Sequence, residues 1–531
     1  MHDIEIKNAS IIDGLGNEAY QGNLYVKDKK ISAITYGESL ESKLSINATG
    51  KVLTPGFIDL HSHSDFSFLL DPTAQSKVRQ GVTLELMGNC GLSFCAPLKG
   101  VSKQQFDSWV SAYTDSFEVT WKDFAGYIDA SKKSGATLNL AFQIGHGTIR
   151  SAVMGMVDRP PTSEELNEMK QLVEESLDAG ALGFSTGLFY APGFYSRTDE
   201  IIALSEEAGK QNKLYSTHQR DEGVSSVGLF VSLNEAIEIG RRAECKVQIS
   251  HVKCHAPAVW GNSGKYLSLL EKANDEGLDI KGDQYPYTRS GTYLSGGLFP
   301  RWALEGGREK TLERMNDEEI KGRIVDGINK IFKNERKAEN VMIGRYVPDE
   351  SFEGKNLVEI AEIFQTSPAE TVLKIYEKGD AGIINLTMID EDVNTFAQHP
   401  YIAVASDGVS LSIDGILSSG TPHPRSYGTN PRFIEKFINN KKLISLTEAI
   451  RKMTSLPAQR IGLTNRGRLT PGYAADLVIL NSSKIKEKST FLNPHQYPEG
   501  ITDVIVNGEF VINDGEFNGK TPGNMITNFN S

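Results

Sequence analysis

Short runs of alternating apolar and polar residues, separated by glycine and asparagine, occur near both ends of the chain. The first part contains "DIEIKNASIID", "GNLYVKDKKISAI" and "LSINATGKVLTPG", and the last part contains "GYAADLVILN" and "GITDVIVNGEFVINDGEF". Alternation bounded by turn residues predicts β-strands. Because chain termini often lie close together, we expect residues 1–55 and 456–531 to pair into one small β-sandwich domain.

Between these ends, strand-like and helix-like segments alternate. In "PTSEELNEMKQLVEESLDAG" apolar residues recur at steps of three and four, which predicts a helix. Eight strand candidates end at "GFIDLHSH", "GVTLELMGNC", "TLNLAFQIGHG", "ALGFSTGLFY", "KLYSTHQRDEG", "KVQISHVK", "LDIKGDQYPY" and "YIAVASDG". This pattern predicts an α/β fold, a (β/α)8 TIM barrel over residues 56–455. The long segment 288–385 does not fit a simple connection, and we expect it to be an insertion near the barrel mouth.

Composition narrows the class of protein. The chain has 531 residues, 39% hydrophobic and 23% charged, and a net charge of −12. These values are typical of a soluble globular protein and disfavour nucleic acid or an anionic membrane as the partner. The N-terminus lacks the pattern of a secretory signal, and no apolar run approaches the ~20 residues that span a bilayer. The four cysteines are too few to staple the chain, so we expect free thiols, a cytoplasmic location and a small-molecule partner.

Metal-ligand residue types lie at the predicted strand ends, where barrel enzymes place their active sites. His61 and His63 follow the first strand, one residue apart, and therefore face the same way. The ends of four other strands carry Cys90, His218, His251 and Asp407. Imidazole, thiolate and carboxylate are the ligands that zinc prefers. The sequence therefore predicts a metal site made of these six residues.

Taken singly, each of these residues has a simpler interpretation. A lone histidine on a strand is often only hydrogen-bonded, and Asp407 before glycine also suits a turn. Cys95, Cys245 and Cys254 fit the role of small buried apolar residues. Cys90 differs because the glycines of "GNCG" let the backbone approach closely and re-aim the thiol.

The motifs carry a resemblance to a known family. The paired histidines, the strand-end histidines, the final aspartate and "NRGRLTPGYAADLVIL" resemble the amidohydrolase superfamily. The finer motifs "MGNCGLSFCAP", "GALGFSTGLFYAPG", "STHQRDEG", "GDQYPYTRSGT" and "HPRSYGTNPR" are similar to the N-acyl-D-amino-acid deacylases, or D-aminoacylases. The resemblance covers nearly the whole chain.

The resemblance implies both a metal arrangement and a reaction. It implies one tightly bound zinc on Cys90, His218 and His251, with a second, weaker position at His61 and His63. It also implies that a metal-activated water cleaves the amide bond of an N-acyl-D-amino acid, with Asp407 as general acid and base. The products would be a D-amino acid and a carboxylate. The preference for the D enantiomer rests on the resemblance alone.

Other functions remain open at this stage. Cyclic-amide hydrolases such as hydantoinases and dihydropyrimidinases bridge two metals with a carbamylated lysine on strand four, but residues 181–193 contain no lysine. A dipeptidase acting on D-residues, a nucleobase or imidazolone deaminase, and a catalytically silent binding protein are the remaining alternatives. Because suitable residues occupy every position needed for metal binding and proton transfer, the sequence disfavours a catalytically silent binding protein.

A free α-carboxylate on the substrate calls for a cation and hydroxyl donors near the metal. Candidates for this role are Lys253, Arg425, Tyr190, Tyr285 and Ser290. The simpler alternative is that the lysine and the arginine are surface charges and that the tyrosines only pack against other side chains. We further hypothesise that Arg289 or Arg301 pairs with an acidic side chain, which would favour N-acyl-D-glutamate or N-acyl-D-aspartate. In the apolar alternative, Phe299, Pro300 and Trp302 line a hydrophobic pocket.

Overall fold

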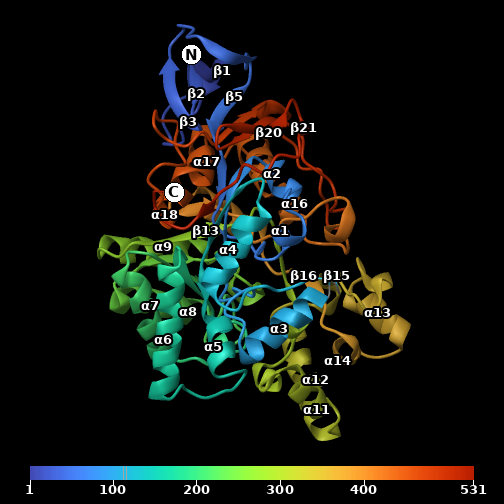
Figure 1. The fold of residues 1–531 in the computed structure, drawn as a ribbon. Helices are drawn as coiled ribbons and strands as arrows, with labels where there is room; N and C mark the ends of the chain where they lie inside the picture. The colour runs from blue at the N-terminus through green and yellow to red at the C-terminus, as the bar shows by residue number, and fades with distance from the viewer. Residues whose placement is uncertain (112, 115–116, 531) are drawn as a thin grey trace.

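An eight-stranded parallel barrel forms the centre of the molecule (Figure 1). The computed structural model describes residues 1–111, 113–114 and 117–530. The ring closes where Ser62, after the first strand, pairs with Gly408, after the last. In order around the barrel the strands are β6 (Phe57–Asp59), β7 (Val82–Met87), β8 (Asn139–Phe142) continuing into β9 (Ile144–Gly145), β10 (Gly183–Gly187), β11 (Leu214–His218), β12 (Lys246–Ile249), β13 (Ile280–Gln284) and β17 (Ile402–Val404). The predicted TIM barrel is confirmed.

Amphipathic helices cover the outside of the barrel. In α6 (Ser163–Asp178) a capping box of Thr162 and Glu165 starts the helix, and its buried face includes Met169 and Val173. This is the helix that the apolar spacing predicts. The other helices of the barrel part are α1 (Ser67–Leu70), α2 (Gln75–Val78), α3 (Gly100–Ser111), α4 (Phe124–Ser134), α5 (His146–Val153), α7 (Thr198–Lys210), α8 (Leu229–Ala243), α9 (Ser263–Asp275), α15 (Asp390–Gln398), α16 (Arg425–Phe433), α17 (Leu446–Met453) and α18 (Ser455–Ile461).

A small β domain combines both ends of the chain. Its strands are β1 (His2–Ile11), β2 (Tyr20–Lys27), β3 (Lys30–Thr35), β4 (Ser42–Asn47), β5 (Val52–Pro55), β18 (Leu477–Leu480), β19 (Ile501–Val506), β20 (Glu509–Asn513) and β21 (Glu516–Phe517). The two halves join where β5 pairs antiparallel with β18. Successive residues of β18 face two cores: Leu477 and Ile479 pack inside the small domain, while Val478 and Leu480 pack against the barrel.

Two parts of the predicted C-terminal segment 456–531 lie in the barrel instead of the small domain. Helix α18 places Leu456 and Ile461 in the apolar core inside the barrel. The last strand, β22 (Met525–Ile526), pairs in parallel with β8. The packing therefore does not follow a boundary at residue 456, because apolar side chains of the C-terminal part help to fill the barrel.

The segment between β13 and β17 has its own sheet and core. Strands β14 (Arg289–Tyr293) and β15 (Val341–Arg345) both pair antiparallel with β16 (Gly382–Leu386). The helices of this segment are α10 (Leu294–Leu298), α11 (Gly307–Met315), α12 (Glu318–Asn334), α13 (Leu357–Phe364) and α14 (Pro368–Lys378). Leu298, Ile328 and Val372 belong to its buried core, which is separate from that of the barrel. The independent core explains how the chain accommodates this segment between two adjacent barrel strands.

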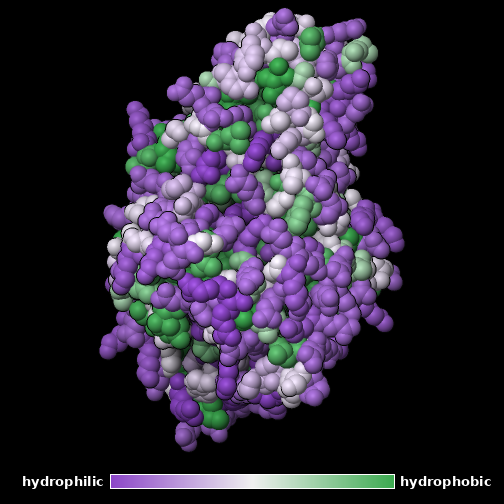
Figure 2. Space-filling view, turned by 90° about the vertical axis from the view of Figure 1, so that its left-hand side faces the viewer, coloured by the Kyte–Doolittle hydropathy of each residue, from purple (hydrophilic) through white to green (hydrophobic). Residues whose placement is uncertain are grey.

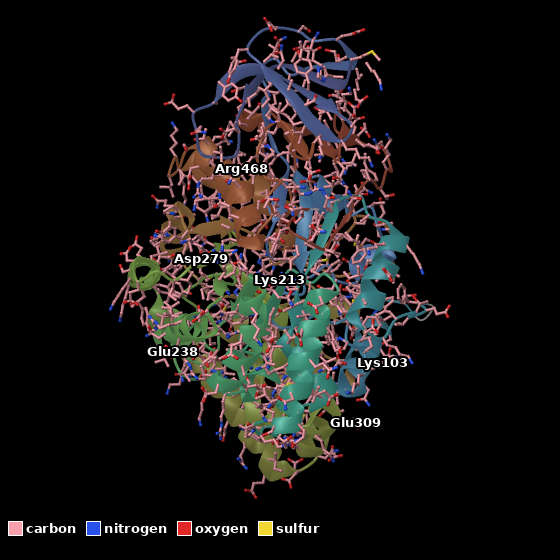
Figure 3. The ribbon with its side chains drawn as sticks, turned by 60° about the vertical axis from the view of Figure 1, so that its left-hand side comes forward. Lys103, Lys213, Glu238, Asp279, Glu309 and Arg468 are labelled. Carbon is pink, nitrogen blue, oxygen red and sulfur yellow. The ribbon has the colours of Figure 1, made fainter. Side chains whose placement is uncertain are left out.

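Charged and polar side chains dominate the face of the molecule shown in Figure 2. Apolar residues on this face form small separate groups. Figure 3 labels Lys103, Glu238 and Glu309 on the outer helices α3, α8 and α11. Among the helices of the described residues, none combines the length and apolar character required to cross a membrane. The four cysteines are free and buried, as predicted.

Candidate metal centre and substrate cavity

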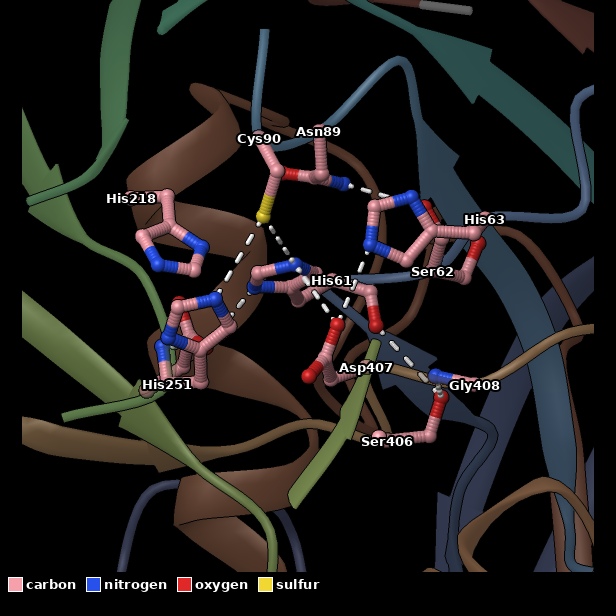
Figure 4. Close-up of polar contacts among 12 residues, drawn as sticks. His61, Ser62, His63, Asn89, Cys90, His218, His251, Ser406, Asp407 and Gly408 are labelled. Atoms are coloured by element: carbon pink, nitrogen blue, oxygen red, sulfur yellow. Dashed lines mark hydrogen bonds and ion pairs between the residues drawn. The ribbon is translucent and has the colours of Figure 1, made fainter. Parts of the chain in front are cut away.

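The six predicted ligands come together at the carboxyl ends of the barrel strands (Figure 4). Donor atoms of His61, Cys90, His251 and Asp407 all lie within 4.8 Å of one another, and all four residues are buried. The side chains approach one another from β6, β7, β12 and β17, which are distant in sequence but meet in the closed barrel. Such a set of nitrogen, sulfur and oxygen donors suits a transition metal.

Cys90 lies at the centre of the cluster. Its Sγ is 3.3 Å from His61 Nε2 and 3.4 Å from His251 Nε2. Burial alone would raise the pKa of the Cys90 thiol, but His61 and His251 hold that pKa well below its ordinary value. The thiolate is the form that binds metals. The surroundings of Cys90 therefore favour its ligand form.

His218 supplies an independent test of the metal interpretation. It is 5% exposed, and neither of its ring nitrogens has a hydrogen-bond partner within the described part of the chain, although Glu222 Oε2 lies 3.5 Å from its Nε2. Its ring centroid is 4.3 Å from that of His251. A buried polar group without a partner costs about 1–3 kcal/mol. A metal ion beside His251 would satisfy this histidine, so the residues present fit a metal.

His63 lies at the other side of the cluster. Its Nε2 is 3.0 Å from Asp407 Oδ1, and Arg425 Nη1 donates to Asp407 Oδ2 at 2.7 Å. Burial by itself would raise the pKa of Asp407, but Arg425 and the histidines His251 and His61 hold that pKa well below its ordinary value. Asp407 is therefore ionised in this arrangement and able to accept a proton.

The backbone carries the ligands in unusual conformations. Cys90, His251 and Asp407 have φ angles of 54°, 37° and 50°, in the left-handed region that non-glycine residues seldom adopt. Such strain concentrates at functional sites because the surrounding structure must hold it. Next to Cys90, a Cβ on Gly91 would lie 2.6 Å from Gly187 N, so only glycine fits there. This is the close approach that the "GNCG" motif predicts.

Two carboxylates that sequence reasoning missed support the ligands. Asp283 Oδ1 lies 3.1 Å from His61 Nδ1, and Glu222 Oε1 lies 3.0 Å from His251 Nδ1. A carboxylate on one ring nitrogen orients a histidine so that the other nitrogen can bind a metal. Asp283 is the last residue but one of β13, within "GDQYPY", and Glu222 follows His218 by four residues in "STHQRDEG". Their positions at strand ends were the available signal.

A cavity of about 240 Å³ adjoins the donor cluster. This volume lies just below the ~300–1,000 Å³ of pockets for drug-sized ligands, so a small molecule fits. All five predicted carboxylate-binding residues line it: Tyr190, Lys253, Tyr285, Ser290 and Arg425. The Tyr285 hydroxyl is buried and has no hydrogen-bond partner among the described residues. Lys253 Nζ is 2.7 Å from both Glu222 Oε1 and His251 Nδ1, which places a cation beside the donor cluster.

Arg289 and Arg301 do not line this cavity. Side chains alternate along β14, so Arg289 points away from Ser290, and its Cζ lies 5.2 Å from the Phe491 ring centroid. Arg301 lies 4.0 Å from the ring centroid of Phe189 and lines a neighbouring cavity of about 720 Å³. Trp302 also lines that second cavity. Among the described residues that line the first cavity, the lysine and arginine side chains are Lys253, Arg336 and Arg425.

Comparison with known proteins agrees with the geometry. A model described as "Amidohydrolase family" matches residues 45–512. An N-acyl-D-aspartate deacylase of Alcaligenes xylosoxydans xylosoxydans is 33% identical over 99% of this chain and 95% of its own length. An N-acyl-D-glutamate deacylase of the same organism is 30% identical over 95% of this chain and 93% of its own length.

Solved structures also place this chain beside the N-acyl-D-amino-acid deacylases. An N-acyl-D-glutamate deacylase from Bordetella bronchiseptica, complexed with zinc and a phosphonate inhibitor, matches with a TM-score of 0.84 and 28% identity, over 99% of this chain and 100% of that chain. A D-hydantoinase has a TM-score of 0.57 at 16% identity over 99% of both chains, a likeness that shows the fold alone. The full-length matches confirm the resemblance that the motifs indicate.

Proposed function

The chain belongs to the amidohydrolase family, and from this premise we propose that it is a zinc-dependent N-acyl-D-amino-acid deacylase. The reaction is hydrolysis of a linear amide: water adds to the carbonyl carbon, the C–N bond breaks, and a carboxylate and a D-amino acid leave. The observation that carries the proposal is that the buried side chains of His61, Cys90, His251 and Asp407 meet beside a cavity lined by a lysine and by hydroxyl groups.

The metal would be held by residues with complementary roles. Cys90, His218 and His251 would bind one zinc tightly, and His61, His63 and Asp407 would form a second, weaker position. Two features support this division: the lowered pKa of the Cys90 thiol and the lack of a partner for the ring nitrogens of His218 within the described chain. Bound zinc supplies Lewis acidity, which activates water and polarises the amide carbonyl.

Asp407 would move the proton. It is ionised, buried and 3.0 Å from His63 Nε2, so it can take a proton from the attacking water and later deliver it to the departing amine nitrogen. Arg425 neutralises the other side of the carboxylate through its 2.7 Å hydrogen bond. Arg425 would therefore set the orientation of Asp407 as well as contribute positive charge to the cavity.

The α-carboxylate of the substrate would bind on the side of Lys253, Tyr285 and Ser290. The Lys253 ammonium supplies the positive charge. The Tyr285 hydroxyl has no hydrogen-bond partner among the described residues, so it is able to donate to the substrate carboxylate. Tyr190, whose hydroxyl lies 2.9 Å from Thr292 Oγ1, lines the same cavity.

A preference for acidic D-side chains is also part of the proposal. Two of the relatives are named for glutamate and aspartate substrates. Arg336 is better placed for such a role than Arg289 or Arg301, because it lines the cavity and is 4% exposed. Its Nη2 donates to Glu335 and His255, while its Nε has no hydrogen-bond partner among the described residues. If Arg336→Ala left the ratio of D-glutamate to D-methionine turnover unchanged, this assignment would be wrong.

The decisive experiment measures amine release by zinc-reconstituted protein. The substrates are N-acetyl-D-methionine, N-acetyl-D-glutamate, their L enantiomers and dihydrouracil under identical conditions. Turnover of D substrates alone is expected. Hydrolysis of dihydrouracil alone would instead support a cyclic-amide hydrolase, although β10 carries no lysine for that chemistry. Cys90→Ala should lose zinc and turnover together, whereas a binding protein would tolerate the change.

A further inference from the structure

The substrate cavity has two chemically different ends. One end carries Lys253, Tyr285 and Ser290, which the proposed function assigns to the α-carboxylate. The other end is largely aromatic and apolar, although the buried Asp65 also lines the cavity, and the reaction does not use its wall residues. These are Leu92, Phe94, Trp109, Tyr113 and Val409. The aromatic end therefore needs an occupant of its own.

The aromatic end is a continuous set of rings. Phe94 and Trp109 stack with centroids 5.4 Å apart, and Tyr113 meets Trp109 edge-on at 5.9 Å. The Arg345 guanidinium lies 3.9 Å from the Tyr113 ring centroid and covers one face of that ring. Phe66 supports the indole from behind, with its centroid 5.2 Å away, and is fully buried. Phe94 and Trp109 themselves are only partly buried and pack on the large core of the barrel. Their remaining exposed faces border the cavity, where an apolar group would cover them.

Barrel topology separates the two ends. Lys253 and Tyr285 follow β12 and β13, the sixth and seventh strands around the ring. Leu92 and Phe94 follow β7, the second strand, and Trp109 lies on α3. In a closed ring of eight strands the second and sixth are opposite each other. The donor cluster lies between them, since Cys90 follows β7 and His251 follows β12.

This placement orients an N-acyl-amino acid in one direction. With its α-carboxylate at Lys253 and its amide carbonyl at the donor cluster, the molecule must extend its acyl group toward the β7 side. The amino-acid side chain branches from the α-carbon and so remains on the Lys253 side of the donors. The group that reaches Phe94 and Trp109 is therefore the acyl group.

We propose that Phe94, Trp109 and Tyr113 form an acyl subsite that selects aromatic or extended apolar acyl groups over acetyl. This inference rests on the proposed deacylase function and adds the class of acyl group to it. Stacking against the exposed ring faces stabilises an arylacetyl group, whereas acetyl is too short to cover them. The carboxylic acid released would then be an apolar one, such as phenylacetate.

The test compares two acyl groups on the same amino acid. N-phenylacetyl-D-methionine and N-acetyl-D-methionine are assayed with the zinc-loaded full-length enzyme, and kcat/KM is measured for each. The wild-type ratio should favour phenylacetyl by at least about tenfold. Trp109→Ala should lower that ratio by about tenfold or more, and Trp109→Phe should retain most of it. Phe94→Ala is the second variant in case Trp109→Ala does not fold.

Trp302→Ala is the matched control, because Trp302 is 37% exposed and lines the other cavity. Its phenylacetyl-to-acetyl ratio should equal that of the wild type. A ratio that is unchanged in both Trp109→Ala and Phe94→Ala would overturn the acyl subsite while leaving the deacylase function intact. A changed preference among N-acetyl-D-amino acids, with the acyl ratio unchanged, would place the amino-acid side chain at the rings instead. Zinc-loaded protein that hydrolyses none of these substrates would overturn the function itself.

Discussion

Two buried clusters of charged and polar side chains draw on the barrel strands β6, β7 and β17, and they differ in whether every polar group has a hydrogen-bond partner. The first, which we call the lysine cluster, consists of Lys77, Asp59, Glu85 and Ser406. Lys77 Nζ donates to Asp59 and Ser406 at 2.7 Å and lies 3.0 Å from Glu85. The second is the donor cluster of the candidate metal centre, where the nitrogens of His218 have no hydrogen-bond partner within the described chain.

The difference shows that the lysine cluster supports the backbone, whereas the donor cluster is available to bind a metal. Each acid of the lysine cluster has further donors: Ser64 and Ser410 donate to Glu85, and the Ser406 amide donates to Asp59. A complete buried network fixes the backbone that carries it. Here that backbone leads directly into Asp407, whose amide donates to the His61 carbonyl at 2.8 Å. The lysine cluster thus fixes the backbone that positions the donor cluster for a metal.

The largest effect should come from removing the proton-transfer group of the donor cluster. Asp407→Asn keeps the shape but cannot accept a proton, so kcat should fall by about 10²- to 10⁴-fold. Steady-state assays of N-acyl-D-methionine hydrolysis measure the loss. Asp414→Asn, an exposed aspartate in the same loop region, is the control and should keep full activity. Near-normal kcat in Asp407→Asn would assign proton transfer to another group.

Opening the lysine cluster should cost stability. Lys77→Met leaves Asp59 and Glu85 as buried carboxylates without their cation, which should lower the free energy of unfolding by about 3–5 kcal/mol. Denaturant titration followed by circular dichroism measures the change. The matched control is Lys103→Met on α3 (Figure 3), because Lys103 is 45% exposed and its ion pair with Asp107 contributes less than about 1 kcal/mol. Equal stabilities of the two variants would refute the supporting role of the lysine cluster.

A smaller effect should follow from weakening a carboxylate that orients a ligand. Glu222→Gln removes the charge beside His251 Nδ1 and Lys253 Nζ, so zinc affinity should fall by about 10- to 100-fold. Competition with a fluorescent chelator measures the dissociation constant. Glu238→Gln, on the outside of α8, should bind zinc like the wild type. If Glu222→Gln also binds zinc like the wild type, the glutamate serves Lys253 alone.

The sequence predicts those site residues that directly follow a recognisable barrel strand. His61, Cys90, His251 and Asp407 were predicted because each ends a recognisable strand, and the barrel brings all strand ends together. Parallel pairing of neighbouring strands then brings the ends of these strands, and the side chains on them, close together. Fold class was predictable for the same reason, since alternating elements admit few closed arrangements.

Contacts between loops were not predictable in this way. Arg425 lines the cavity, in keeping with the predicted substrate role, but its hydrogen bond to Asp407 was not predicted. Arg289 seemed near the site in sequence, yet the alternation of β14 turns its side chain away. Trp109 reaches the cavity from α3, and nothing in the spacing from Cys90 reveals this. Loop paths depend on tertiary packing, which local periodicity does not encode.

The last prediction contrasts the lysine cluster with a buried lysine held only by backbone carbonyls. Lys452 in α17 is fully buried and donates to the carbonyls of His399 and Ile402. Burial lowers its pKa to about 7, whereas in the unfolded chain it is near 10.4. Between these values the unfolded chain binds the extra proton, so this lysine makes stability rise with pH above 7.

Lys452→Met removes that contribution. Relative to the wild type, the free energy of unfolding of the variant should therefore be lower at pH 9 than at pH 6, by about 3 kcal/mol across this range. Urea unfolding at pH 6, 7.5 and 9 measures the difference. Parallel pH profiles for the two proteins would mean that Lys452 is charged in the folded state throughout, and that backbone carbonyls can satisfy a buried ammonium as fully as the two carboxylates around Lys77 do.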